Sequence, residues 1–218
     1  MRIVIAGGHG QVALRLSRLL AARGDDVLAL VRNPEHVTDV LATGAEAALA
    51  DLERDSVDTL AAHLTGADAV VFAAGAGPGS GSARKDAVDR GGAALLADAA
   101  ASAGVRRYVL VSSMGAGAAP PPEADDTFAA YLRAKTDAEN DLRGRDLDWT
   151  ILRPGGLTDG VGTGRVRLEP AVPGGRVPRD DVAAVLAALL AEPRSTGLTL
   201  ELTAGDIPID AAIQAELG

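Results

Sequence analysis

The first thirty residues of the chain constrain its fold more than any other segment. A short apolar run, Arg2–Ala6, leads directly into a glycine-containing turn; an amphipathic stretch over Gln11–Ala22 and a second apolar run over Val27–Val31 follow. This order predicts a strand, a tight turn, a helix and a second strand. Two strands joined through a helix run parallel, so the segment favours an α/β sheet.

The same alternation continues through most of the chain. Four more strands are expected at Ala45–Ala50, Ala69–Ala73, Tyr108–Ser112 and Trp149–Arg153, and four more helices at Pro34–Leu41, Ser56–Leu64, Ala83–Ala103 and Phe128–Leu142. Aromatic residues make up only 2% of the sequence, so the core must consist of Ala, Val and Leu, which suits helices packed closely on a parallel sheet. The predicted fold class is α/β, with a doubly wound parallel sheet of the Rossmann type.

The C-terminal part of the chain has a different composition. Residues 154–178 are rich in Gly and Pro, with a short strand expected at Val166–Leu168; beyond them we expect a helix at Arg179–Ala191, a strand at Leu198–Leu202 and a helix at Ile209–Leu217. Roughly 60 residues could hardly fold alone. We therefore expect one domain over residues 1–218, with residues 154–218 as a small lobe over the strand ends, on the substrate side.

The bulk properties exclude several classes of protein. A net charge of −9 argues against a broad nucleic-acid surface, and the absence of Cys excludes disulfides and thiol chemistry. The spacing of His, Asp and Glu does not suggest a metal site. No apolar run reaches the roughly 18 residues of a membrane span, and no signal-peptide pattern is present. We expect a cytoplasmic protein whose partner is a small molecule, not a membrane or a nucleic acid.

The glycine turn predicts a phosphate-binding site. Gly7, Gly10 and Ala13 form a G-x-x-G-x-x-A frame between the first strand and the first helix. A helix that opens on such a turn presents free N–H groups and the positive end of its dipole, which suit the diphosphate of a dinucleotide. The residues expected to contact it are Gly7, Gly8, His9, Gly10, Gln11 and Val12. The alternative is a tight turn without a ligand.

The tip of the second predicted strand indicates which dinucleotide is bound. Arg32 stands where an acidic residue would bond the ribose 2′-hydroxyl in an NAD enzyme, while Asp25 and Asp26 precede the strand. A guanidinium matches a 2′-phosphate through two parallel hydrogen bonds. NADP(H) is therefore favoured over NAD(H), the alternative being a solvated surface arginine.

Two further strand ends complete the expected cofactor site. Asp51, with Leu52 beside it, is placed to accept a hydrogen bond from the adenine amino group; alternatively, it is a cap or a first-turn acid of the helix predicted at Ser56–Leu64. The small residues Ala73, Ala74 and Gly75 follow the fourth strand. They would let the sheet edge run beneath the cofactor, or they form only a flexible turn.

Tyr131 and Lys135 lie four residues apart on a predicted helix and therefore share one face. A nearby ammonium stabilises a phenolate, which suits Tyr131 as a proton donor, and Lys135 is also placed to reach a ribose hydroxyl. Ser112 and Ser113 end the fifth strand and point to opposite sides, and Ser113 is our choice to hold a substrate oxygen. The alternative is an ordinary pair on a helix surface.

The helix expected at Ala83–Ala103 begins with mixed charges. Its basic residues Arg84, Lys85 and Arg90 are interleaved with Asp86 and Asp89. This pattern is interpreted as a solvated helix face, without a chemical role.

Taken in order, these segments resemble an atypical short-chain dehydrogenase/reductase of the NAD(P)H-binding, NmrA-like kind. The matching segments are GGHGQVA at 7–13, LVR at 30–32, AD at 50–51, VSSMGA at 111–116, YLRAK at 131–135, TILRPGGL at 150–157 and VPRDDVA at 177–183. The resemblance implies a single NAD(P)-binding Rossmann domain with Ser113, Tyr131 and Lys135 as the catalytic residues. It also implies a cofactor site that includes Ser112 and Lys135, with Pro154, Gly155, Gly156 and Leu157 near the nicotinamide.

The activity expected from this reading is NADPH-dependent reduction of a small carbonyl or conjugated aromatic compound. The loops Gly115–Thr127 and Gly156–Gly164 are expected to wall the substrate site. The alternative is an NADP(H)-binding regulatory or sensor protein without turnover. A sugar-nucleotide epimerase or dehydratase ranks below both, because the C-terminal part is short for covering a nucleotide sugar. A homodimer paired through the helices at Ala83–Ala103 and Phe128–Leu142 is a further expectation drawn from relatives.

Overall fold

The computed structural model describes residues 1–77, 81–120 and 124–218. Its strands are β1 (Arg2–Ala6), β2 (Asp26–Val31), β3 (Glu46–Leu49), β4 (Ala69–Phe72), β5 (Arg107–Val111), β6 (Asp148–Pro154), β7 (Gly156–Thr158), β8 (Arg165–Glu169), β9 (Arg176–Pro178), β10 (Thr199–Ala204) and β11 (Ile207–Pro208). Its helices are α1 (Gln11–Ala22), α2 (Val37–Leu41), α3 (Val57–Leu64), α4 (Ser82–Lys85), α5 (Ala93–Ser102), α6 (Asp126–Arg143), α7 (Arg179–Leu190) and α8 (Ile209–Glu216). Two 3₁₀ turns, η1 (Pro34–His36) and η3 (Pro193–Ser195), and one π-helical segment, η2 (Asp86–Gly92), join them.

In the described residues the main sheet has nine strands in the order β3-β2-β1-β4-β5-β6-β10-β8-β11, and β7 pairs with β9 in a small second sheet. Neighbours from β3 to β10 are parallel, whereas β8 is antiparallel to both β10 and β11. This confirms the predicted doubly wound α/β sheet.

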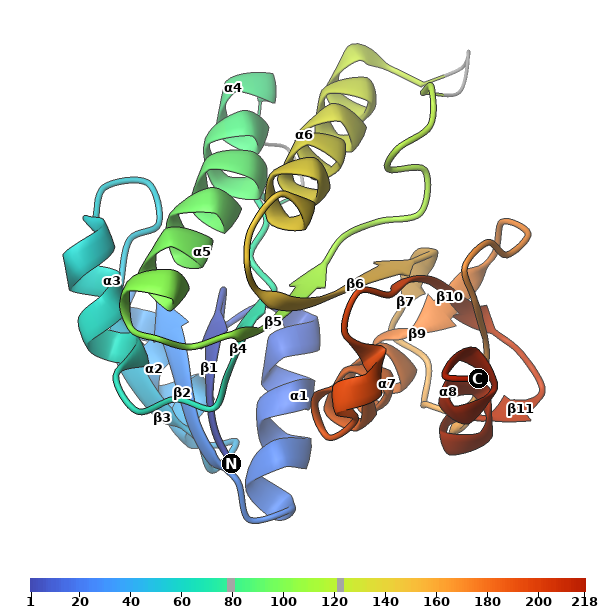
Figure 1. Ribbon diagram of the computed structural model, residues 1–218, viewed down its shortest axis with the longest axis horizontal. Helices are drawn as coiled ribbons and strands as arrows, with labels where there is room; N and C mark the ends of the chain where they lie inside the picture. Colours follow the sequence, from blue (N-terminus) through green and yellow to red (C-terminus); the bar gives the residue numbers. More distant parts are fainter. Residues whose placement is uncertain (78–80, 121–123) are drawn as a thin grey trace.

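The sheet is covered on both faces, which explains its continuous apolar strands. Along β1, Ile3 and Ile5 pack on one side while Val4 and Ala6 pack on the other. The first side is covered by α1, α2, α7 and α8, and the second by α3, α5 and α6 (Figure 1).

The strand order reverses between β1 and β4. The chain runs outward from β1 to β2 and β3, then returns to β4 on the other side of β1. Loops that leave neighbouring strands in opposite directions open a crevice at the carboxyl ends of those strands. The crevice lies between Gly7, after β1, and Ala73, after β4, and it positions the site described below.

The C-terminal residues extend the main sheet. β10 pairs in parallel with β6, with Leu200 opposite Leu152. Leu186 of α7 is fully buried in the same core as Leu16 of α1. At the outer edge of the sheet lie β8 and β11, with α8 beside them at the right of Figure 1.

The helices and strands differ from the sequence expectation in two respects. The helix expected at Ala83–Ala103 is interrupted by the π-helical segment η2, and β7, β9 and β11 were not predicted. These three short strands form through pairings between segments distant in the sequence. In the described part of the chain, no helix is long and apolar enough to span a membrane.

Candidate functional site

Two adjoining cavities open at the carboxyl ends of the parallel strands. The first cavity, of about 470 Å³, is lined by residues 7–10, 30–33, 50–53, 73–75 and 77 with His36, Arg84 and Val88. The second cavity, of about 660 Å³, is lined by residues 10–12, 73–77, 111–113, 154, 155 and 157 with side chains of α6, η2, α4 and α7. Gly10 and residues 73–75 line both, so the two cavities form one groove across the N-terminus of α1.

Steric contacts require glycine at two positions of the glycine turn. Gly7 has a φ of +79°, and a Cβ there would lie 2.5 Å from the Cα of Ala74; a Cβ on Gly8 would lie 2.6 Å from the Cβ of Ala29. Glycine at these two positions is therefore demanded by the packing of the turn itself. A Cβ on Gly10 would make a milder contact, 3.2 Å from the carbonyl oxygen of Gly7, and all three glycines line the first cavity.

The N-terminus of α1 fits the diphosphate of a dinucleotide. Gly10 is its N-cap and supplies no capping side chain, and the first turn carries no acidic residue. The first N–H groups of a helix lack intrahelical partners and carry partial positive charge. Here they open onto the groove without a competing carboxylate.

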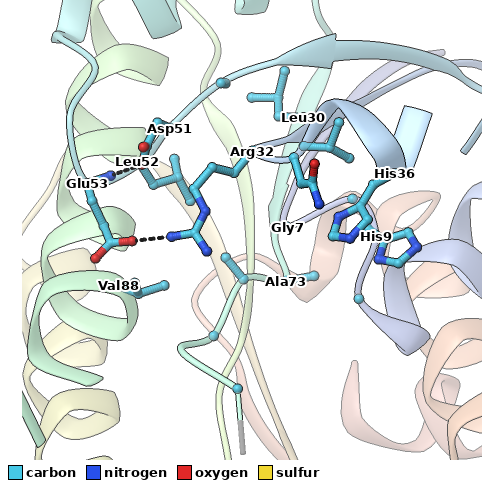
Figure 2. A pocket seen from close by; sticks show the side chains of 18 of the residues that line it. Gly7, His9, Leu30, Arg32, His36, Asp51, Leu52, Glu53, Ala73 and Val88 are labelled. Atoms are coloured by element: carbon cyan, nitrogen blue, oxygen red, sulfur yellow. Dashed lines mark hydrogen bonds and ion pairs between the residues drawn. The ribbon is translucent and has the colours of Figure 1, made fainter. Parts of the chain in front are cut away.

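Two guanidinium groups meet at the far end of the first cavity. Nη1 of Arg32 lies 2.6 Å from Oε2 of Glu53 (Figure 2), and Nη2 of Arg84 lies 3.5 Å from the same oxygen. The Arg32 side chain is 52% exposed, so an anionic group can reach it. Glu53 and Arg84 were not assigned to the site from the sequence.

Asp51 stabilises the turn that carries Glu53. Its Oδ1 accepts a hydrogen bond from the backbone N–H of Glu53 at 3.0 Å (Figure 2). The N-cap of α3 is Ser56, whose Oγ accepts from the N–H of Thr59. The alternative interpretation of Asp51 as a helix cap is therefore wrong, and Asp51 remains on the wall of the first cavity.

Two stacked imidazoles border the glycine turn. The rings of His9 and His36 lie 3.6 Å apart between centroids at an interplanar angle of 11° (Figure 2), and Nε2 of His9 lies 2.8 Å from Oδ2 of Asp39. His9 is thus held in place beside the turn. His36 was not assigned to the site from the sequence.

In the second cavity, Lys135 is buried and makes two polar contacts that the sequence did not predict. Its side chain is 4% exposed; Nζ donates to the carbonyl of Val111 at 3.0 Å and lies 3.1 Å from Oδ1 of Asp89. Asp89 is 1% exposed and also accepts from the N–H of Ala76 at 3.2 Å. The half-buried Tyr131 ring is beside them, its centroid 5.8 Å from Nζ of Lys135.

The interpretation of the α4–η2 charges as a solvated face is therefore wrong for Asp89, whereas Arg84 and Lys85 keep part of their solvent exposure although they line the cavities. Asp89 is buried because Lys135 pairs its charge, Arg84 lines the first cavity and Lys85 lines the second. Only Asp86 and Arg90 form the exposed i,i+4 pair expected of such a face.

The two serines after β5 point in different directions. Oγ of Ser112 donates to Oε1 of the fully buried Glu139 at 2.6 Å. Burial alone would raise the pKa of Glu139, but hydrogen bonds from Arg153 and Ser112 outweigh it and hold that pKa below its ordinary value. Ser113 is half-buried, and its Oγ donates to the Met114 carbonyl at 3.2 Å within the second cavity.

Of the residues expected to bind cofactor or substrate, all but Gly156 line one of the two cavities. Gly156 instead pairs with Arg176 between β7 and β9. Part of the expected wall Gly115–Thr127 falls at residues 121–123, outside the described residues, but Asp125 and Thr127 line the second cavity. Sequence reasoning did not assign Phe128 and Arg179, which line it as well. Among the described residues, no three His, Asp or Glu side chains are grouped to hold a metal ion.

The fold and the groove together define a dinucleotide-binding Rossmann protein. A family model described as NAD(P)H-binding matches residues 7–193. The chain therefore belongs to this NAD(P)H-binding family, as its motifs predicted.

Individual relatives are similar over nearly the full length. The chain is 37% identical to the uncharacterized sugar epimerase YhfK of Bacillus subtilis, over 98% of this chain and 99% of that one. A structure from Bacillus halodurans described as an NAD-dependent epimerase/dehydratase matches with a TM-score of 0.90 and 34% identity, over 98% and 99% of the two chains. ChuY, an anaerobilin reductase of Escherichia coli O157:H7, matches with a TM-score of 0.79 and 28% identity, over 95% and 98%.

Proposed function

We propose that this protein is an NADPH-dependent reductase of a small carbonyl or conjugated aromatic compound. The observation that carries the proposal is the single groove, which runs from two guanidinium groups past an uncapped helix N-terminus to Tyr131 and Lys135. NADPH is elongated and anionic at its adenosine end and its centre, and the positive groups of the groove stand at the matching places.

We assign a different part of the cofactor to each part of the groove. Arg32 and Arg84 receive the 2′-phosphate in place of Glu53, and the N–H groups of α1 receive the diphosphate. The small residues Ala73, Ala74 and Gly75 form the floor between the two cavities. The nicotinamide cofactor, when bound, supplies the hydride.

The chain's own groups handle the proton and the orientation of the substrate. Tyr131 donates a proton to the reduced oxygen, and Ser113 orients that oxygen. Lys135 is fixed by Asp89 and the Val111 carbonyl, so its ammonium stays at a constant position beside Tyr131. The relative ChuY, named as a reductase, supports reduction as the reaction type.

A specific observation favours the second candidate, an NADP(H)-binding sensor without turnover. The ammonium of Lys135 already has a buried carboxylate partner, which reduces the positive charge available to Tyr131. In such a protein the groove would bind the cofactor and only change its shape or its contacts.

Binding and turnover separate these two functions. NADPH and NADH are titrated by calorimetry, and NADPH oxidation is followed with quinones, flavins and aldehydes in the wild type and in Tyr131→Phe. We expect tight NADPH binding in both proteins and turnover at least about 100-fold slower in the variant. Binding without turnover on any acceptor supports the sensor, and no binding of either nucleotide at millimolar concentration rejects both functions.

A further inference from the structure

The chain contains only two lysines, although it has 21 basic residues in all. Both of them, Lys85 on α4 and Lys135 on α6, line the second cavity. Both also lie near the ring of Tyr131, with Nζ at 5.1 Å and 5.8 Å from its centroid. The proposed function uses Lys135 and leaves Lys85 without a role.

The two ammonium groups are in different electrostatic states. Lys135 is buried against Asp89, which neutralises its charge locally. Lys85 is only half-buried, and no carboxylate of the described residues lies within ion-pair distance of it. Lys85 therefore presents a full positive charge to the cavity.

None of the other charged side chains at the cavity is paired with Lys85 in the described residues. Asp125 lines the same cavity, but its carboxylate accepts the N–H of Phe128 at the start of α6 and is not within ion-pair distance of Lys85, and Arg179 is paired with Asp159 at 2.8 Å. The chain as a whole has a net charge of −9, so a cation on a cavity wall without an ion-pair partner is unusual for it. A cation in this state is suited to an anionic ligand group.

Aromatic and aliphatic side chains are exposed on the cavity that Lys85 lines. The ring of Phe128 is 44% exposed and stacks on Tyr131, with centroids 6.1 Å apart. Leu157 of β7 is 37% exposed on the same cavity. Large apolar side chains kept exposed on a cavity wall indicate a ligand that covers them.

We propose that the second cavity takes a planar, conjugated substrate that carries a carboxylate, and that Lys85 receives this carboxylate. The inference rests on the proposed function, because it names the substrate class of the same site. The ring system lies against Phe128, Tyr131 and Leu157, while the acid stays at the α4 edge of the cavity.

The test uses a matched pair of ligands, 9-fluorenone-2-carboxylate and its methyl ester, which differ in charge and share a planar conjugated ketone. Their binding to protein loaded with NADP⁺ is measured by calorimetry in the wild type, Lys85→Met, Lys85→Arg and Arg133→Met. Arg133→Met removes an exposed cation of α6 outside both cavities and serves as the control.

We expect the carboxylate to bind about tenfold more tightly than the ester in the wild type, as for one charge-assisted hydrogen bond. The preference should disappear in Lys85→Met and persist in Lys85→Arg and Arg133→Met. Equal binding of the two ligands to the wild type, a preference that survives in Lys85→Met, or no binding of either ligand overturns the proposal.

Two further measurements, NADPH affinity and NADPH oxidation, distinguish this inference from the reductase function. NADPH affinity should be the same in Lys85→Met and the wild type; a loss of cofactor affinity with the ligand preference intact would assign Lys85 to the cofactor and overturn the proposal. A carboxylate preference with no NADPH oxidation on the two ketones or on any of the quinones, flavins and aldehydes would support the subsite and reject the reductase. Equal turnover of acid and ester would support the reductase and reject the subsite.

Discussion

Gly7 and Gly24 both have positive φ angles, but only Gly7 is pressed against another part of the chain. A Cβ on Gly7 would lie 2.5 Å from the Cα of Ala74, whereas a Cβ on Gly24 would meet nothing within 4 Å. Gly24→Ala should therefore cost about 1–2 kcal/mol of unfolding free energy, the cost of the backbone conformation alone. Gly7→Ala should cost about 1–3 kcal/mol more, because the β1 and β4 loops must separate. Urea unfolding measures both, and equal losses would show that the contact is unimportant.

Arg32 and Glu53 form an ion pair whose two members should affect cofactor binding in opposite directions. Arg32→Ala should weaken NADPH binding by about 1.5–3 kcal/mol, the range for hydrogen bonds to charged groups, and leave NADH binding almost unchanged. Glu53→Gln should strengthen NADPH binding, because it removes the carboxylate that holds both Arg32 and Arg84.

Calorimetric titration with both nucleotides measures these changes. Arg54→Ala removes a neighbouring cation that is 86% exposed and lines neither cavity, so it should leave both affinities unchanged. Equal losses of NADPH and NADH affinity in Arg32→Ala would remove Arg32 as the selector.

Most residues that line the groove could be expected from the sequence, because the strand–turn–helix pattern fixes which residues stand at the carboxyl ends of strands. Their partners could not be expected in the same way. Asp89 is buried only because Lys135, on another helix, compensates its charge. Ser112 points to Glu139 because this buried carboxylate, also on another element, accepts its hydrogen bond. The scarcity of lysine was the signal in the sequence that could have placed Lys85 at the site.

At the scale of elements, one buried carboxylate ties together β5, α6 and β6. Glu139 of α6 is fully buried and accepts hydrogen bonds from Ser112, just after β5, and from Arg153 of β6, and Arg143 lies 2.9 Å away. Breaking such a buried pair typically costs about 3–5 kcal/mol, because the remaining charge loses its partner. We therefore expect Glu139→Gln to lower the unfolding free energy by that amount at neutral pH.

The same carboxylate should make stability depend on pH. Because the pKa of Glu139 in the folded protein lies below its ordinary value of 4.5, the unfolded chain takes up a proton first as the pH falls. The stabilisation is present above pH 4.5 and is lost as the pH falls from there through the folded-state pKa. Urea unfolding from pH 7 to pH 3 should show this loss in the wild type and a smaller loss in Glu139→Gln. Glu169→Gln, which removes an exposed carboxylate paired with Arg167, should follow the wild type; identical pH profiles for all three would contradict the assignment.

The limits of the helices and strands agree closely with the sequence prediction where a local sequence pattern determines them. β1 and α1 have the predicted limits, because an apolar run, a glycine turn and an amphipathic stretch each act locally. The π-helical segment η2 was not predictable, since no local pattern marks it. Asp89, which pairs with Lys135, lies in this segment. β7 and β9 form from Gly- and Pro-rich segments that gain strand structure only by pairing with each other.

At the scale of the whole molecule, the assembly of two subunits stays a prediction. Its expected helices, α5 and α6, cover one face of the sheet beside each other (Figure 1). Sedimentation velocity at micromolar concentration should give the mass of a dimer, twice 22.0 kDa. A monomer at that concentration would contradict the expectation drawn from relatives.

Residues 154–218 should unfold together with the rest of the chain, because they complete its core. Leu186 of α7 is fully buried in the apolar cluster that contains Leu16 of α1, and β10 continues the sheet at β6. Leu186→Ala should therefore lower the unfolding free energy by about 2–5 kcal/mol, the cost of a cavity in a packed core. Leu41→Ala, at a side chain that is 56% exposed, should change it little.

Far-ultraviolet circular dichroism and the fluorescence of Trp149 on β6 should report one coincident transition in the wild type and in both variants. A separate early transition in Leu186→Ala, seen by circular dichroism and not by Trp149, would show that the C-terminal part is an independent folding unit and that the chain is not one domain.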